Sequence, residues 1–259
     1  MAKSLAVITG ASSGIGMTFA RRLAPHYDLL IIARRQDLLT SLAAELATEH
    51  GSTVHTLAAD LTDDAELRLV AARIAAERDL ALLVNNAGFG NRGAFWEADL
   101  GLIEKMHRLH VMAIIRLSHA ALRVMVAHDR GAIINVASVA SFAQRADSAS
   151  YGATKSWLTA FSEGLYLDLK KANSAVIIQA LCPGFTYSGF HDVMGADRRK
   201  SAPASFWLSA EKVVDDSLRA LNRGTLFVVP GWRYKLLVGI LTKLPVRLKL
   251  YFEAPRRAH

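Results

Sequence analysis

Short apolar runs alternate with longer stretches of helical spacing along most of the chain. Runs rich in leucine and β-branched residues stand at 5–9, 28–33, 53–58, 80–84 and 131–137. Helical patterns begin at Met17, after Thr62 or Asp63, after Ser150 and near Glu211. Strands that alternate with helices in this way are typical of βαβ units, so the pattern predicts an α/β fold.

The pattern changes after Pro230. Five apolar residues there form one helical stripe: Leu236, Leu237, Ile240, Leu241 and Leu244. Pro245 interrupts the stripe. In residues 246–252 apolar and basic residues alternate so closely that the pattern does not distinguish a strand from a helix. The basic residues and the proline argue against a membrane-spanning helix. Two interpretations stay open for this basic amphipathic extension, residues 231–259. It either lies on an anionic membrane surface or packs over a substrate cleft or a partner subunit.

Length and composition indicate one domain, residues 1–230, followed by that extension. The chain has 259 residues of which 52% are hydrophobic, enough for a large core, and no low-complexity linker interrupts it. A single cysteine, Cys182, excludes an internal disulfide framework or a cysteine-built metal site, which fits a reducing compartment. The N-terminal apolar run is too short for a signal peptide, so we expect a cytoplasmic protein.

The positive charge is concentrated at the end of the chain. The formal net charge is +8, and residues 231–259 hold seven basic residues against Glu253 alone, a balance of 7 − 1 = +6. The preceding 230 residues are therefore nearly neutral. We expect no nucleic-acid partner, because no recognition element carries the excess.

A glycine-rich loop joins the first predicted strand to the first predicted helix. The loop reads Gly10-Ala-Ser-Ser-Gly14-Ile-Gly16. Glycines at such a junction let the backbone turn tightly and approach a pyrophosphate, whose charge is met by the free amides of the helix N-terminus. This context favours dinucleotide binding over a simple turn.

The end of the second predicted strand indicates which dinucleotide is bound. Arg34 and Arg35 follow the strand, where an NAD-binding fold usually places an acidic residue for the ribose hydroxyls. A guanidinium suits a 2′-phosphate instead, so the sequence favours NADP over NAD. Asp37 is close enough that a different strand end would reverse this prediction.

Three residues between 138 and 155 suggest catalytic chemistry. Ser138 follows the apolar run 131–137, so its hydroxyl should emerge at the carboxyl end of a strand, where open α/β sheets bind ligands. Tyr151 and Lys155 are one helical turn apart. A phenol is a poor acid–base group near neutral pH unless a nearby cation stabilises its phenolate, and Lys155 can be that cation.

Together these motifs resemble the short-chain dehydrogenases/reductases. The resemblance rests on TGASSGIG at 9–16, Asn85-Asn86-Ala87-Gly88, Ser138, Tyr151-x-x-x-Lys155 and Pro183-Gly184, and covers roughly residues 3–230. It implies a single doubly wound Rossmann domain with a seven-stranded parallel sheet, NAD(P)-dependent carbonyl/alcohol chemistry and a homodimer or homotetramer.

The resemblance also assigns roles to individual residues. Ser138 would polarise the carbonyl, Tyr151 would transfer the proton, and Lys155 would hold the nicotinamide ribose while supporting the phenolate. Ser12 and Arg34 would meet the 2′-phosphate. The implied cofactor contacts are Gly10, Ser12, Ser13, Gly14, Ile15, Gly16, Arg34, Arg35, Asp60, Leu61, Asn86, Ala87, Gly88, Tyr151, Lys155, Pro183, Gly184, Phe185, Thr186 and Ser188.

His110 departs from the family pattern. It stands where many members carry an Asn that holds a water in a proton relay to the lysine. A histidine either relays protons itself or marks lost activity, so His110 is a fourth candidate catalytic residue. His107 lies one helical turn away, but no third ligand accompanies the pair and we expect no metal site.

The segments between the motifs indicate the substrate. One of these segments is a predicted substrate loop at about 188–209. Together the segments are rich in large apolar residues: Phe89, Phe95, Trp96, Phe142, Phe185, Tyr187, Phe190, Met194, Phe206 and Trp207. These favour an apolar carbonyl compound over a small polar acid. The sequence thus predicts an NADPH-dependent reductase of a hydrophobic ketone or aldehyde; the alternative is an NADP-binding regulator or scaffold with little turnover.

Overall fold

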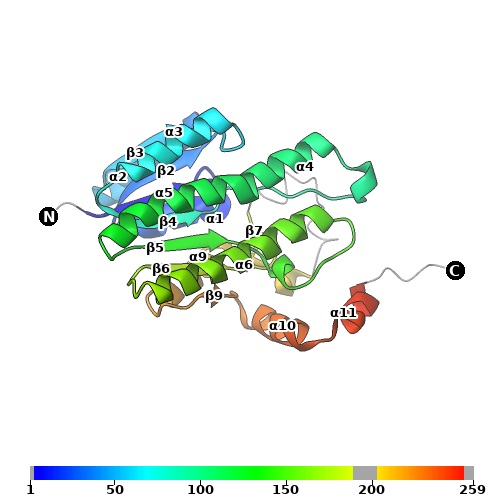
Figure 1. Cartoon of the computed structure of the whole chain (residues 1–259). Helices are drawn as coiled ribbons and strands as arrows, with labels where there is room; N and C mark the ends of the chain where they lie inside the picture. Colours follow the sequence, from blue (N-terminus) through cyan, green and yellow to red (C-terminus); the bar gives the residue numbers. More distant parts are fainter. Residues whose placement is uncertain (1–2, 189–202, 254–259) are drawn as a thin grey trace.

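The protein is built around one parallel sheet, which Figure 1 shows behind the helices of its near face. The computed structural model describes residues 3–188 and 203–253. Within these ranges seven strands pair in the order β3-β2-β1-β4-β5-β6-β9, all parallel. They are β1 (Leu5–Thr9), β2 (Asp28–Ala33), β3 (Val54–Ala58), β4 (Leu80–Asn85), β5 (Ala132–Val136), β6 (Ile177–Leu181) and β9 (Phe227–Val228). This confirms the predicted doubly wound sheet of seven strands.

Helices cover both faces of the sheet (Figure 1). They are α1 (Gly14–Leu23), α2 (Gln36–His50), α3 (Asp64–Ala75), α4 (Leu100–His107), α5 (Ile114–Ala127), α6 (Ala149–Lys171), α9 (Ala210–Leu221), α10 (Trp232–Lys243) and α11 (Val246–Glu253). Phe19, Leu39 and Val213 bring α1, α2 and α9 onto one face, while Val70 and Leu117 bring α3 and α5 onto the other. All five side chains are buried, so the sheet lies between two apolar layers.

Short elements join the main ones. They are the 3-10 turns η1 (Phe95–Glu97), η3 (Val139–Ser141) and η4 (Ala204–Phe206), the π-helical turn η2 (Arg108–Ala113), and the two-stranded pair β7 (Thr186–Tyr187) and β8 (Leu208–Ser209). The predicted substrate loop connects β7 to β8. Most of it, with Phe190 and Met194, lies outside the described residues.

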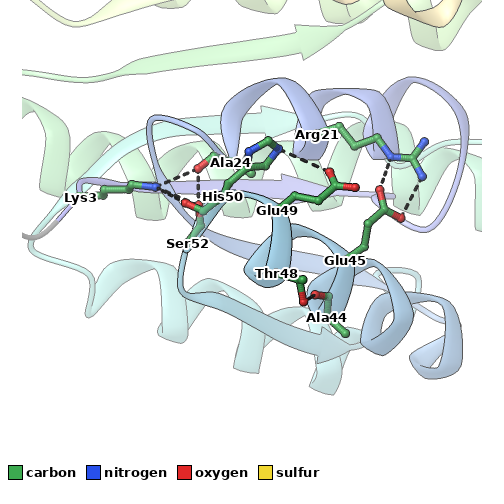
Figure 2. Close-up of polar contacts among 9 residues, drawn as sticks. All are labelled: Lys3, Arg21, Ala24, Ala44, Glu45, Thr48, Glu49, His50 and Ser52. Carbon is green, nitrogen blue, oxygen red and sulfur yellow. Dashed lines mark hydrogen bonds and ion pairs between the residues drawn. The ribbon is translucent and has the colours of Figure 1, made fainter.

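Polar contacts fasten α1 to α2 on their shared side of the sheet (Figure 2). The Arg21 guanidinium donates to the Glu45 carboxylate, with Nε and Oε1 2.8 Å apart. The Lys3 ammonium donates to the Ala24 carbonyl at 3.2 Å and to the Ser52 hydroxyl at 3.0 Å. These contacts hold the two helices that support the glycine loop and the end of β2.

The end of β2 decides the residue that faces the cofactor. Because β2 ends at Ala33, Arg34 is the first residue beyond the sheet, as predicted. Asp37 lies in the first turn of α2 and is exposed. Asp63 is the predicted cap of the following helix, and its carboxylate accepts from the first free amides of α3.

One continuous helical stretch joins α4, η2 and α5. Of the described helices, this one, Leu100–Ala127, is long and apolar enough by composition to cross a membrane, with a mean hydropathy of 1.4. However, 44% of its apolar window is buried within the fold. Leu117 and Met125 belong to the core between α5 and the sheet, so the pattern fits a core helix.

The basic extension begins where β9 ends and packs back onto the domain. Tyr234 and Val238 on α10 are buried, whereas Leu236 and Ile240 of the predicted apolar stripe face outward. Residues 246–252, for which the sequence left strand and helix open, are helical in α11. The structure therefore places α10 over the cleft described below and leaves a second apolar face uncovered.

Candidate active site

The sequence motifs meet in one cleft of about 1040 Å³ at the carboxyl edge of the sheet. Strand order reverses between β1 and β4, and this switch point is where such sheets bind dinucleotides. Nineteen of the twenty predicted cofactor contacts line this cleft, and Ser138 lines it as well: the nineteen are Gly10, Ser12, Ser13, Gly14, Ile15, Arg34, Arg35, Asp60, Leu61, Asn86, Ala87, Gly88, Tyr151, Lys155, Pro183, Gly184, Phe185, Thr186 and Ser188.

Gly16 is the predicted contact that does not line the cleft. A Cβ at this position would collide with the Gly10 carbonyl, so Gly16 shapes the loop from behind. Gly10 has a φ of +66°, and a Cβ there would lie 2.8 Å from Asn86 Nδ2. Asn86 Nδ2 in turn donates to the Thr9 carbonyl at 2.9 Å. The turn after β4 therefore holds the glycine loop in place, and the loop leaves room for a phosphate.

An arginine and two serines form an anion cradle at one end of the cleft. Arg35 Nη2 donates to Ser12 Oγ at 2.9 Å and to Ser13 Oγ at 3.3 Å. Arg34 also lines this end. The resemblance implies that Ser12 and Arg34 meet the 2′-phosphate, and the hydrogen bond to Ser12 brings Arg35 to the same place. Two guanidinium groups and two hydroxyls fit the 2′-phosphate of NADP.

The predicted catalytic residues come together at the middle of the cleft. Ser138 follows β5, and its Oγ accepts from the Ala140 amide at 3.1 Å, which fixes the hydroxyl. Tyr151, in the first turn of α6, is hydrogen-bonded to Ser138. One turn later, Lys155 Nζ lies 5.8 Å from the centre of the Tyr151 ring. The hydroxyl, phenol and amine therefore share one site, as the spacing predicts.

Burial decides the protonation of this group. Burial raises the pKa of Tyr151 to about 12, and the hydrogen bond from Ser138 opposes this rise. Burial likewise lowers the pKa of Lys155 to about 8, and its Nζ donates to the Val136 carbonyl at 2.8 Å. The sequence predicts that Lys155 favours the phenolate. Burial instead raises the pKa of Tyr151, so the phenol keeps its proton at neutral pH.

His110 is fully buried on the π-helical turn η2, outside the cleft lining. Its Nε2 accepts from the Phe89 amide at 3.2 Å, and its Nδ1 is 3.0 Å from Thr154 Oγ1. Because the Thr154 hydroxyl donates to the Tyr151 carbonyl at 2.8 Å, the network assigns the proton to Nδ1. Burial, followed by the charge of Lys155, holds the pKa of His110 well below its usual value.

This geometry places His110 between two catalytic segments instead of in direct contact with the lysine. One nitrogen holds the loop that contains Phe89, and the other supports the first turn of α6. Within the described residues, no hydrogen bond joins His110 to Lys155. The proton relay through His110 stays a prediction.

Among the described residues, no group of three His, Cys, Asp or Glu side chains could hold a metal ion. His107 Nε2 is instead hydrogen-bonded to Ser150 Oγ at 2.6 Å. Cys182 is buried, and burial raises the pKa of its thiol to about 12.

Aromatic side chains form part of the cleft lining. Phe89, Phe185 and Phe206 contribute to it, as the sequence suggested for the aromatic loops. Phe95 and Trp96 do not, because both are exposed and lie outside the lining.

Helix α10 adds to this lining, in line with the interpretation that the extension packs over a cleft. Tyr234, Leu237 and Leu241 of that helix line the cleft. The Tyr234 hydroxyl accepts from the Phe185 amide at 3.0 Å and donates to the Phe206 carbonyl at 2.7 Å. Its ring lies where a Cβ on Gly184 would be, so Gly184 is needed for this contact. The sequence did not indicate which residues of the extension would make these contacts.

Comparison with known proteins agrees with the site. The family described as short chain dehydrogenase matches residues 4–199. A putative ketoacyl reductase of granaticin polyketide synthesis from Streptomyces violaceoruber is 32% identical over 237 residues, covering 90% of this chain and 82% of that protein.

Two solved structures extend the likeness across the chain. A short-chain dehydrogenase from Sphingobium yanoikuyae in complex with NADPH is 33% identical, with a TM-score of 0.84 and coverage of 99% of this chain and 98% of that one. A bulky-bulky ketone specific alcohol dehydrogenase from Comamonas testosteroni is 30% identical, with a TM-score of 0.80 and coverage of 100% and 97%.

The fold and the Ser138, Tyr151 and Lys155 site define an α/β oxidoreductase. The chain belongs to the short-chain dehydrogenase family, as the match over residues 4–199 shows.

Proposed function

We propose that the protein is an NADP(H)-dependent reductase that interconverts a hydrophobic ketone or aldehyde and its alcohol. The observation that carries this proposal is the hydrogen-bonded pair of Ser138 and Tyr151 in a cleft whose lining includes the apolar side chains of Phe89, Phe185, Phe206, Leu237 and Leu241. The relative from Comamonas testosteroni is named for bulky ketones, which supports a large apolar substrate.

The residues of the cleft fit NADP. The glycine loop leaves space for the pyrophosphate at the N-terminus of α1, and Arg34, Arg35 and Ser12 would hold the 2′-phosphate. The Sphingobium yanoikuyae relative was solved with NADPH. When bound, this cofactor supplies the hydride that reduces the carbonyl carbon.

The protein's own residues then bind and protonate the carbonyl oxygen. Ser138 and Tyr151 offer hydroxyl groups to it, and Tyr151 transfers its proton as negative charge develops there. The proton is available because the raised pKa of about 12 keeps the phenol protonated. The Lys155 ammonium stabilises the phenolate that remains, and it also helps to hold the ribose.

The test is consumption of NADPH in the presence of apolar and polar carbonyl compounds. We expect turnover with bulky aryl or alicyclic ketones, little with sugar acids, and none in the Tyr151→Phe variant. Tight binding of NADPH by the wild-type protein with no turnover of any compound would favour the regulator or scaffold. No binding of NADPH would contradict both functions.

A further inference from the structure

Helix α10 is apolar on two sides, and only one of them is covered. Tyr234 and Val238 are buried against the domain. Trp232, Leu236 and Ile240, each four residues apart, form a second stripe that is 69%, 59% and 50% exposed. A soluble amphipathic helix usually turns charged residues outward, so the outer stripe needs an explanation.

Helix α11 carries further exposed apolar residues beyond Pro245. Val246 and Leu250 are four residues apart, so they share one side of this helix, and both are exposed. We call the exposed apolar residues of the two helices, Trp232, Leu236 and Ile240 with Val246 and Leu250, the α10–α11 face. A surface patch of several large apolar residues commonly marks a protein or membrane contact.

Basic residues accompany this face. The segment 231–253 holds Arg233, Lys235, Lys243, Arg247 and Lys249 against Glu253, a balance of 5 − 1 = +4. Arg233 lies over the Trp232 ring, with its guanidinium carbon 5.2 Å from the ring centre. Long basic side chains can extend their charge to headgroups while their stems stay in an apolar layer.

We propose that the α10–α11 face binds the surface of an anionic lipid bilayer. Exposed leucine, isoleucine and tryptophan side chains with interspersed Lys and Arg have the chemistry that such a surface recognises. A second copy of the chain fits less well. A two-fold contact brings the same patch of both subunits together, so it would place two positively charged segments against each other.

The α10–α11 face lies next to the cleft, so membrane binding would bring the cleft close to the bilayer. Leu237 and Leu241 line the cleft from the helix that carries the outer stripe, and Tyr234 anchors that helix to Phe185 and Phe206. Docking would therefore hold the apolar wall of the cleft near the lipid. This consequence rests on the proposed function, because only an apolar substrate would partition into the bilayer beside the cleft.

Vesicle co-sedimentation of the full chain tests the proposal without measuring activity. The vesicles contain phosphatidylcholine alone or phosphatidylcholine with phosphatidylglycerol. We expect binding to the anionic vesicles that weakens at least about tenfold between about 0.1 M and about 1 M salt, because the Debye length falls from about 10 Å to about 3 Å. Uncharged vesicles should bind much less.

Two variants distinguish binding through the α10–α11 face from nonspecific binding to vesicles. Leu236→Glu with Ile240→Glu should weaken binding to anionic vesicles about tenfold or more, since it removes two large apolar side chains and adds repulsive charge. Leu69→Glu is the control, because Leu69 is 69% exposed on α3, which lies on the other side of the molecule from α10 (Figure 1). It should bind like the wild type. NADPH affinity and a thermal melt confirm that each variant is folded.

Each outcome decides the proposal. Equal sedimentation with both vesicle types, or no effect of the double variant, overturns it. If the double variant changes only the sedimentation coefficient from dimer to monomer and vesicles never bind, the face is an interface between copies. Failure of NADPH-dependent turnover would overturn the proposed function and leave the vesicle result intact, so the two failures are distinguishable.

Discussion

Replacement of Lys155 by Met should stabilise the cofactor-free protein at neutral pH while it abolishes turnover. Lys155 is buried, and the carbonyl of Val136 accepts its one described hydrogen bond from the ammonium. Burial lowers its pKa from 10.5 to about 8. The folded state therefore disfavours the charge that the site needs, and methionine has a similar length without the charge.

The magnitude follows from the difference between the two pKa values. A fall from 10.5 to about 8 corresponds to roughly 3 kcal/mol of folding free energy lost while Lys155 is charged. Methionine leaves the Val136 carbonyl without its donor, which costs about 1 kcal/mol. We expect Lys155→Met to be more stable than the wild type by about 2 kcal/mol at pH 7.

The effect should reverse at high pH. Because the folded pKa lies below the unfolded one, the unfolded chain binds more protons between about pH 8 and pH 10.5. The wild-type protein gains stability relative to the variant across that window. Above it Lys155 is neutral in both states, and the wild type should be the more stable by about 1 kcal/mol, the value of its hydrogen bond.

Urea unfolding of both proteins without cofactor, at pH 7 and near pH 10.5, measures this difference. Comparing the two proteins at each pH removes the contribution of the other groups that titrate. A variant that is less stable at pH 7, or a stability difference that does not change with pH, would refute the reasoning. A gain in stability with loss of turnover would show that the site holds a charge at the expense of folding.

The other predictions concern turnover and cofactor choice. Tyr151→Phe should abolish turnover and leave NADPH affinity within a few-fold, because it removes the proton donor and little surface; substantial residual turnover would contradict the assignment. NADPH should bind at least about tenfold tighter than NADH in calorimetry, a difference of roughly 1.4 kcal/mol. Arg34→Asp and Arg35→Asp should each narrow this preference for NADPH, since both arginines line the cleft. Equal affinities of the wild type for NADPH and NADH would show that the anion cradle does not bind the 2′-phosphate. His110→Ala should lower activity at every pH, because the imidazole stays neutral and accepts a hydrogen bond from the Phe89 amide. His110→Asn should keep activity. If His110→Ala matches the wild type at all pH values, His110 has no part in catalysis.

The sequence, together with its resemblance to the short-chain dehydrogenases/reductases, was enough to predict the sheet, the cleft and most of its lining. Strand ends and turn residues are local features, and parallel strands bring their carboxyl ends to one edge. Gly10, Arg34, Asn86 and Ser138 each follow a strand closely, so they had to converge once the sheet was known. The spacing of Tyr151 and Lys155 likewise required only one helical turn.

Contacts between distant segments were decided by the tertiary structure. The sequence predicted that His110 lies on a helix, but the π-helical turn and the hydrogen bond to Phe89 follow from packing. The hydrogen bond from Arg35 to Ser12 likewise depends on the reach of the arginine side chain. These choices depend on distances that spacing along the chain does not define.

The tertiary structure also decided the protonation of the site and what each of the two faces of α10 contacts. The spacing suggested that Lys155 would favour the Tyr151 phenolate, yet burial raises the pKa of that phenol. Similarly, the apolar stripe after Pro230 predicted a helix but not that Tyr234 would lie on Gly184 while Leu236 faced outward. Periodicity determines which residues share a face, and only the folded chain determines what that face meets, because desolvation and contact depend on every segment packed around it.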